Sequence, residues 1–193
     1  MNDPKIRSEF KRQYLQHVKP PCFIADEVGL MGATSIADLV VITPTALEGF
    51  EIKSGSDTLV RLPNQINIYS QIFDFVSIVT EPKYLAQIET MVPSFWGIIV
   101  VEEHTDSVGF HSHRNPTLND CIKPRKIAEL LWKDEVRSIL EKRNIRGISR
   151  LNRAKLWDIL SVSITRAELK EEVYKTLSSR TLWKKGLVLL AKE

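Results

Sequence analysis

Cysteine and histidine are scarce in this 193-residue chain, which has two cysteines and four histidines. Cys22 and Cys121 lie far apart in the sequence. A disulfide framework needs several cysteines, and a cysteine zinc site needs closely spaced pairs, so this sequence argues against both. We expect the two cysteines to be free thiols.

Long apolar runs are also missing. No stretch approaches the roughly 20 apolar residues that a membrane-spanning helix needs. Residues 1–18 are charged and amphipathic and lack the apolar core of a signal peptide. Hydrophobic residues make up 43% of the chain and charged residues 26%, which is typical of a globular protein. We therefore expect a cytoplasmic protein with no membrane partner.

Positive charge is depleted in the first part of the chain and concentrated in the last. Residues 1–120 carry 9 Lys and Arg against 15 Asp and Glu, a net charge of −6. Residues 121–193 carry 18 against 9, a net charge of +9, and the two parts sum to the overall +3. This asymmetry predicts two functional parts, the second either a polyanion-binding module or a solvated helical surface.

The apolar pattern of residues 1–120 predicts an α/β fold around one mixed sheet. β-branched and aliphatic runs predict strands buried on both faces, and apolar residues three and four apart predict helices. Residues 103–120 are polar, contain Gly and Pro, and predict a loop or short hairpin. The expected order is a helix at 5–18, extended residues 22–30, strands at 36–43 and 50–54, a helix at 62–75, a strand at 76–80, a helix at 81–91 and a strand at 95–102.

Residues 121–193 have a helical pattern and predict a helical module of about 70 residues. Three apolar stripes follow one another, within 127–140, 156–160 and 169–177. Trp132, Trp157 and Trp183 are expected on the apolar side of this module, as core residues and not as stacking platforms for bases.

Two opposite charges stand in the apolar run "EGFEIKSGSD". Glu51 and Lys53 are two residues apart, so a strand would place both on one face. Burying such a pair is costly unless something completes the site. Asp38 lies on the preceding strand, and two converging carboxylates are ligands that Mg²⁺ prefers, with the Ile52 carbonyl as a third. A lysine beside such a cation can orient a water for attack on a phosphate.

This pattern resembles the PD-(D/E)XK nuclease superfamily. The resemblance rests on Asp38, on "EIK" thirteen residues later, and on Gln65 and Tyr69, which match the QxxxY helix motif of RecB-type members. It implies a restriction-endonuclease-like core, with the order αβββαβ and a mixed central sheet flanked by helices. It also implies that Glu27, which falls where many members carry an additional acidic residue, assists the metal. Small bacterial and phage members linked to DNA repair are similar.

The resemblance covers residues 20–102 and departs from the superfamily pattern at one position. Ala37 stands where the name of the superfamily places proline. Asp26 competes with Glu27 for the accessory acidic role. Asp57 and Arg61 flank the entry to the motif helix, where Asp57 would brace the loop. Arg61 would contact either a phosphate or an acidic side chain.

The histidines give a weaker signal. His111 and His113 alternate, so a strand would place them on one face, with His104 nearby. They lack a cysteine or carboxylate at standard metal-ligand spacing, and an exposed polar loop is the simpler interpretation. His113 or Arg114 contacting nucleic acid is the alternative.

Residues 137–155 are strongly basic and contain one acidic residue, Glu141. Gly147 separates two helical stretches, and this order of helix, short link and basic helix resembles the SAP-type DNA-binding module. The alternative is a helical support or an oligomerisation surface. The expected nucleic-acid contacts are Arg61, Arg143, Arg146, Arg150, Arg153 and Lys155.

The sequence thus predicts a Mg²⁺- or Mn²⁺-dependent phosphodiesterase that acts on DNA. Its catalytic residues would be Asp38, Glu51, Lys53, Glu27, Gln65 and Tyr69. The partner would be DNA, with a homodimer and an activating protein as further possibilities. The alternatives are a catalytically silent nuclease scaffold that binds DNA or assists assembly, and a toxin or defence nuclease with the same chemistry. The sequence does not distinguish an endonuclease from an exonuclease, or DNA from RNA as the substrate.

Overall fold

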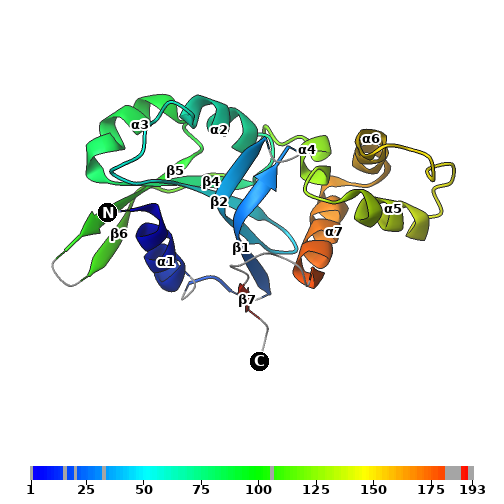
Figure 1. Ribbon diagram of the computed structural model, residues 1–193, viewed down its shortest axis with the longest axis horizontal. Helices are drawn as coiled ribbons and strands as arrows, with labels where there is room; N and C mark the ends of the chain where they lie inside the picture. Colours follow the sequence, from blue (N-terminus) through cyan, green and yellow to red (C-terminus); the bar gives the residue numbers. More distant parts are fainter. Residues whose placement is uncertain are drawn as a thin grey trace.

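The computed structural model describes residues 2–14, 17–19, 21–31, 34–104, 107–180 and 188–190. It is a mixed α/β protein in which a central sheet is flanked by helices, with a group of helices at one end (Figure 1). The prediction of an α/β fold around a mixed sheet is therefore confirmed. Among these residues no helix combines the length and the apolar character needed to cross a membrane.

The sheet has seven strands in the order β6-β5-β4-β3-β2-β1-β7. β3 pairs in parallel with β4, and β4 with β5, while the other neighbours are antiparallel. The expected hairpin of the second and third strands is present, because Ile42 pairs with Leu47 across a short turn. The strands are β1 (Cys22–Leu30), β2 (Ser35–Ile42), β3 (Leu47–Lys53), β4 (Phe75–Thr80), β5 (Gly97–Glu103), β6 (Val108–Arg114) and β7 (Val188–Leu190).

Helices cover both faces of the sheet (Figure 1). One face carries α1 (Asp3–Tyr14), whose Ile6 and Phe10 are buried one turn apart against Phe50 and Ile52 of β3. The other face carries α2 (Leu62–Tyr69) and α3 (Leu85–Met91), with the short 3-10 turn η1 (Pro82–Tyr84) before α3. β3 is thus buried on both faces, so a charged side chain on it needs a partner.

One sequence expectation needed correction in this part of the chain, and one open alternative is resolved. The helix expected at 62–75 ends at Tyr69, because the side chain of Asn119 donates to the carbonyls of Ser70 and Phe73 and holds a turn there. Of the loop or hairpin alternatives for 103–120, the hairpin is present, with β6 paired to β5.

The C-terminal helices are α4 (Pro124–Ala128), α5 (Lys133–Lys142), α6 (Arg153–Ser163) and α7 (Arg166–Ser179). Asn152 caps α6, and Thr165 with Glu168 forms a capping box on α7. Their apolar side chains join the sheet core, because one continuous cluster includes Val40, Ile78, Leu160 and Val173. The chain then returns to the sheet, where β7 pairs with β1.

The expectation that the tryptophans are core residues holds for Trp157, which is buried and donates to the carbonyl of Leu131. It is wrong for Trp132, which is 55% exposed. α4 ends at Ala128, so the apolar stripe is broken before Trp132, and its ring instead carries the Arg180 guanidinium. Trp183 lies outside the described residues.

A buried ion pair connects α7 to the sheet. Lys170 Nζ lies 2.9 Å from Asp74 Oδ1, and Asp74 Oδ2 accepts the backbone N–H of Leu47 at 2.8 Å. Asp74 is 2% exposed, so its charge depends on these two donors. Leu47 begins β3, and the pair therefore ties the helical module to the strand that carries Glu51 and Lys53.

We expect Asp74→Ala to lower the free energy of unfolding by about 3–5 kcal/mol, because Lys170 would be left as a buried unpaired charge. The matched control is Lys175→Ala, which removes an exposed ion pair with Glu171 on the same helix and should cost at most about 1 kcal/mol. Urea unfolding of the two variants measures the difference. Equal losses would show that Asp74 does not connect the module to the sheet.

Candidate functional site

The site begins where β2 and β3 stop pairing. Leu39 and Phe50 are the last partners in their register, which places Asp38 across from Glu51. The next backbone N–H, that of Ile52, donates to Asp38 Oδ2 at 2.8 Å in place of a strand partner. The sequence therefore puts a carboxylate at the point where the strands part, and that carboxylate satisfies the freed backbone group.

Glu51 is at the centre of a buried hydrogen-bond network. It is 1% exposed and accepts from three side chains. Lys53 Nζ and Gln65 Nε2 each lie 2.5 Å from Glu51 Oε1, and the Tyr69 hydroxyl lies 2.6 Å from Oε2. Gln65 and Tyr69 are one helical turn apart, so α2 points both toward β3. The four residues that the sequence singled out are thus brought together.

Burial and charge keep the tyrosine protonated. Burial, and then the charge of Glu51, raise the pKa of Tyr69 well above its usual range. The hydroxyl of Tyr69 therefore remains a donor to Glu51 at physiological pH.

Asp38 is easier to protonate than an ordinary aspartate. Burial, and then the charge of Glu51, raise its pKa to about 7. The Ile52 N–H and Arg7 lower the pKa but do not outweigh these two effects. A carboxylate whose ionisation is opposed by burial and by a second carboxylate belongs to a site that favours an added cation.

Glu27 lies on β1, the neighbour of β2 on the side away from β3, and is directly opposite Asp38. Asp26 pairs with Leu39 and Val28 with Ala37, and the register between them puts Glu27 opposite Asp38. Glu27 has a φ of 53°, a left-handed conformation that a non-glycine residue rarely adopts. Its side chain is 69% exposed and accepts from Arg7. Asp26, the competing residue, instead pairs with Lys11.

Two residues of α1 complete the site, and sequence reasoning missed both. Arg7 lies 2.9 Å from Asp3 Oδ2, 3.1 Å from Glu27 Oε1 and 3.4 Å from Asp38 Oδ1. Burial disfavours its charge, yet Asp3 and Asp38 are close enough that the pKa of Arg7 is raised above its ordinary value. No motif spacing links α1 to Asp38, although the i,i+4 pair of Asp3 and Arg7 is visible in the sequence.

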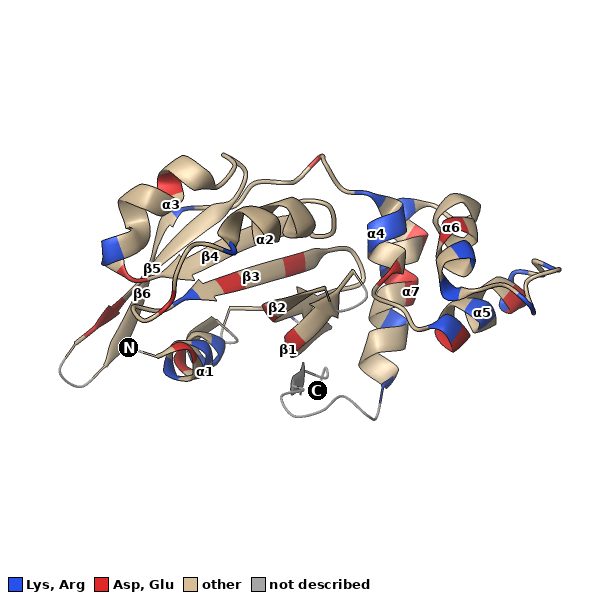
Figure 2. Cartoon of the chain, turned by 45° about the horizontal axis from the view of Figure 1, so that its top comes forward, with Lys and Arg blue, Asp and Glu red and all other residues tan. Residues whose placement is uncertain are grey.

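One open cavity of about 480 Å³ is lined by most of these residues, namely Asp3, Arg7, Glu27, Asp38, Glu51, Lys53 and Gln65, but not by Tyr69. Arg61 and Asn64 lie on its wall at the start of α2, and Thr34, Ser35 and Ile36 lie on the opposite wall at the start of β2. Asp57 also lines the cavity, and it braces the loop by accepting from the backbone and hydroxyl of Ser54. In Figure 2 the end of β3 that carries the site points away from the helical module.

The oxygen donors of the cavity suit a hard divalent cation such as Mg²⁺. Asp38 and Glu51 both line it, and neither carboxylate uses all its lone pairs on the partners described above. Gln65 Oε1 is buried beside them and has no hydrogen-bond partner among the described residues. Across the described part of the chain, no group of three or more His, Cys, Asp or Glu side chains is arranged to hold a metal. Any such cation would thus have two side-chain carboxylates and other oxygens around it.

The basic residues of the helical module fall into two groups. Arg143 is bound to Glu168 and Glu172 of α7, and Arg153 lies over the ring of Trp157. Arg146, Arg150 and Lys155 are exposed, and none of them forms an ion pair within the described residues. The second group is therefore the part of the predicted nucleic-acid surface that makes neither an ion pair nor a ring contact within the described residues.

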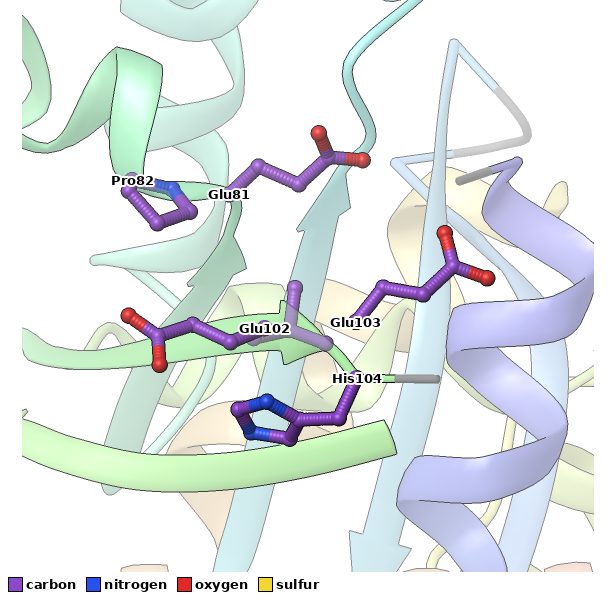
Figure 3. Close-up of a pocket in the computed structure, with 6 residues that line it drawn as sticks. Glu81, Pro82, Glu102, Glu103 and His104 are labelled. Carbon is purple, nitrogen blue, oxygen red and sulfur yellow. The ribbon is translucent and has the colours of Figure 1, made fainter. Parts of the chain in front are cut away.

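A second cavity, of about 310 Å³, lies where β4 and β5 end. It is lined by Glu81, Glu102, Glu103 and His104, and the side chain of Glu102 points in the opposite direction from those of Glu81 and Glu103 (Figure 3). Glu103 is paired with Lys5, and Glu81 accepts from the backbone N–H of Gly55. This arrangement does not converge on a ligand.

The paired histidines do not form a site either. His113 is on β6 and bonds to Glu89 of α3, and His111 is exposed. This contact joins β6 to α3. Arg114, the other residue considered for nucleic acid, donates to the carbonyls of Trp96 and Pro93.

The fold and site define a mixed α/β protein with a buried carboxylate–lysine network at the point where two strands diverge. The profile of the family "Bacteriophage P4 protein cII" matches residues 10–188, and the chain belongs to this family. Protein cII of Enterobacteria phage P4 is 28% identical over 159 residues, which cover 81% of this chain and 59% of that protein. The chain thus spans about three fifths of the length of this relative.

Two solved structures are distantly similar. One is the SPO1766 protein of unknown function from Silicibacter pomeroyi, with 13% identity, a TM-score of 0.42, and coverage of 76% of this chain and 92% of that one. The other is SfsA of Pyrococcus furiosus in complex with Ca²⁺, with 12% identity, a TM-score of 0.36, and coverage of 60% and 64%. Both likenesses are too distant to indicate a function.

Proposed function

We propose that this chain is a metal-dependent nuclease that hydrolyses phosphodiester bonds in DNA on a restriction-endonuclease-like core. The observation that carries the proposal is the network around Glu51. A buried carboxylate that accepts from Lys53, Gln65 and Tyr69, beside Asp38 in an open cavity, is expensive for a purely structural role. The order of α1, β1, β2, β3, α2 and β4 agrees with that core.

The proposed cation ligands are Asp38, Glu51 and the carbonyl of Ile52, with Glu27 assisting directly or through water. When bound, Mg²⁺ or Mn²⁺ would polarise the phosphate and stabilise the charge that develops on it. Asp38 must lose its proton to serve, and its pKa of about 7 makes this possible near neutral pH.

Lys53 is the residue proposed to position the attacking water. Its side chain is 3% exposed and its Nζ is held by Glu51, so its position is fixed before substrate arrives. A fixed cation beside the phosphate also stabilises negative charge in the transition state at little reorganisation cost. Gln65 and Tyr69 orient Glu51, and through it Lys53, from α2.

Substrate contacts are proposed at two places. Arg61 at the cavity wall would contact the phosphate near the cleaved bond. The basic residues of the helical module would hold the flanking DNA. A homodimer that cuts both strands, and a protein partner that activates the enzyme, are compatible with this surface.

The experiment that tests the proposal is a cleavage assay on linear duplex, circular duplex and single-stranded DNA, with Mg²⁺, Mn²⁺ or EDTA. We expect metal-dependent cleavage by the wild-type protein and its loss in Lys53→Met. The control, Lys175→Met, removes an exposed lysine on α7 and should cleave normally. Cleavage of the circle would define an endonuclease.

The opposite outcome supports the second class of function. If the wild-type protein binds Mn²⁺ and DNA but leaves DNA and RNA intact in every buffer, the nuclease proposal fails. A silent nuclease scaffold that binds DNA or assists assembly would then account for the site. A toxin or defence nuclease would share the chemistry and give the same result as the leading proposal.

A further inference from the structure

Arg7 is the only basic side chain that α1 directs to the site cavity among the described residues. The other basic residues of α1 point elsewhere, Lys5 to Glu103, Lys11 to Asp26 and Arg12 to Glu9. Arg7 bridges three carboxylates of the site, on α1, β1 and β2. Its side chain is 15% exposed, so its charge depends on these partners.

Arg7 and a divalent cation compete for the same oxygens. Asp38 Oδ1 faces Arg7 and Glu27 Oε1 accepts from it, while Asp38 is a proposed cation ligand and Glu27 is proposed to assist the cation. Two cations close together repel strongly in a partly buried site. A cation that takes over Asp38 and Glu27 would therefore push Arg7 away from them.

A displaced Arg7 needs a new anion. It would keep Asp3, its i,i+4 partner, but would lose two carboxylates while remaining mostly buried. An uncompensated buried charge is costly. Arg7 Nε is also buried and has no hydrogen-bond partner among the described residues, so the guanidinium already holds a spare donor. A phosphate accepts such a fork of donors well.

We propose that Arg7 is a cation-gated phosphate ligand, which neutralises Glu27 and Asp38 in the metal-free site and turns to a substrate phosphate when a divalent cation takes them over. This inference rests on the proposed function. The buried, unpartnered Gln65 Oε1 on the same cavity wall independently indicates a ligand there. Cation and DNA would then bind cooperatively, and Arg7 would carry part of that coupling.

The first measurement is Mn²⁺ affinity by calorimetry, without DNA, in wild type, Arg7→Met and Arg12→Met. Arg12 is the matched control because it is on the same helix and pairs with Glu9 at the surface. We expect Arg7→Met to bind Mn²⁺ about tenfold more tightly, because the carboxylates lose their competing cation. Arg12→Met should bind as wild type. Unchanged or weaker binding by Arg7→Met, or no Mn²⁺ binding by any of the three, overturns the proposal.

The second measurement is the affinity for a short duplex in Ca²⁺ and in EDTA, with gels to show that the duplex stays intact. Ca²⁺ should strengthen DNA binding by the wild type more than by Arg7→Met, by roughly fivefold or more. An equal gain in the two proteins overturns the phosphate role. Arg7→Lys is the second variant if Arg7→Met does not fold. Its ammonium should still compete with Mn²⁺ for the carboxylates, but it cannot make a bidentate contact with the phosphate, so Ca²⁺ should strengthen its DNA binding less than that of the wild type.

These outcomes separate the inference from the proposed function. If the wild-type protein cleaves DNA with metal and Arg7→Met is unchanged in both measurements, the nuclease proposal stands and the proposed role of Arg7 fails. If Arg7→Met binds Mn²⁺ more tightly and gains less DNA affinity from Ca²⁺, but the wild-type protein cleaves nothing, the proposed role of Arg7 stands and the nuclease proposal fails.

Discussion

Replacing Asp38 by asparagine is expected to abolish metal-dependent cleavage without destabilising the metal-free protein. Asp38 is a proposed cation ligand, and loss of one such ligand removes several kcal/mol of transition-state stabilisation, or about a thousandfold in rate. Within the fold, however, the negative charge of Glu51 repels the ionised carboxylate of Asp38. An amide of the same shape relieves that repulsion.

The pH dependence of stability gives the second half of this prediction. The folded-state pKa of Asp38, about 7, is above its ordinary value near 4, so the folded protein binds this proton more tightly than the unfolded chain does. Stability from this group is present at low pH and is lost as the pH rises from about 4 to about 7. Urea unfolding of metal-free wild type should show this fall, and Asp38→Asn should reduce it. An Asp38→Asn protein that cleaves at the wild-type rate, or one with an unchanged pH profile of stability, would contradict the assignment.

Much of this site follows from two periodicities. The two-residue period of a strand places Glu51 and Lys53 on one face, and the one-turn period of a helix places Gln65 and Tyr69 on one face. Both pairs meet because α2 packs over β3, which the short connection between them favours. The order of elements from α1 to β5 and the hairpin of β2 and β3 were predictable for the same reason, whereas β7, in a segment with a helical pattern, was not.

The parts that the sequence did not predict depend on contacts between distant segments. Arg7 reaches Asp38 only because Ile6 and Phe10 fix α1 on the opposite face of the sheet. Tyr14 strengthens that position by donating to Glu48 of β3. No local rule connects these residues, so α1 looked like an ordinary amphipathic helix.

Charge counting also gave an incomplete picture of the helical module. The sequence showed a run of basic residues but not which of them are already neutralised. Arg143 is bound to Glu168 and Glu172 across 25 and 29 residues, and that pairing depends on how α7 packs. The predicted DNA contacts are therefore unequal, and this inequality is testable.

Removing the unneutralised charges of the helical module should weaken DNA binding strongly. The variant Arg146→Gln, Arg150→Gln, Lys155→Gln removes three exposed charges that have no acidic partner among the described residues. If each contacts a phosphate, the slope of log affinity against log salt should fall by about 2–3, at about 0.9 per phosphate. Affinity at low salt should fall by one to two orders of magnitude, roughly tenfold for each 1.4 kcal/mol lost. Fluorescence anisotropy of a labelled duplex over a salt series measures both.

Arg143→Gln is the matched control, because its guanidinium already serves Glu168 and Glu172. It should change the salt slope by well under one unit. Cleavage of a small chromogenic phosphodiester should be unaffected in both variants, since such a substrate reaches only the cavity and the module lies beyond the far end of β3 (Figure 2). If Arg143→Gln weakens DNA binding as much as the triple variant does, the absence of an acidic partner does not identify the residues that contact DNA. If the triple variant binds as wild type, the module is a structural support, and the DNA contacts must lie around the cavity itself.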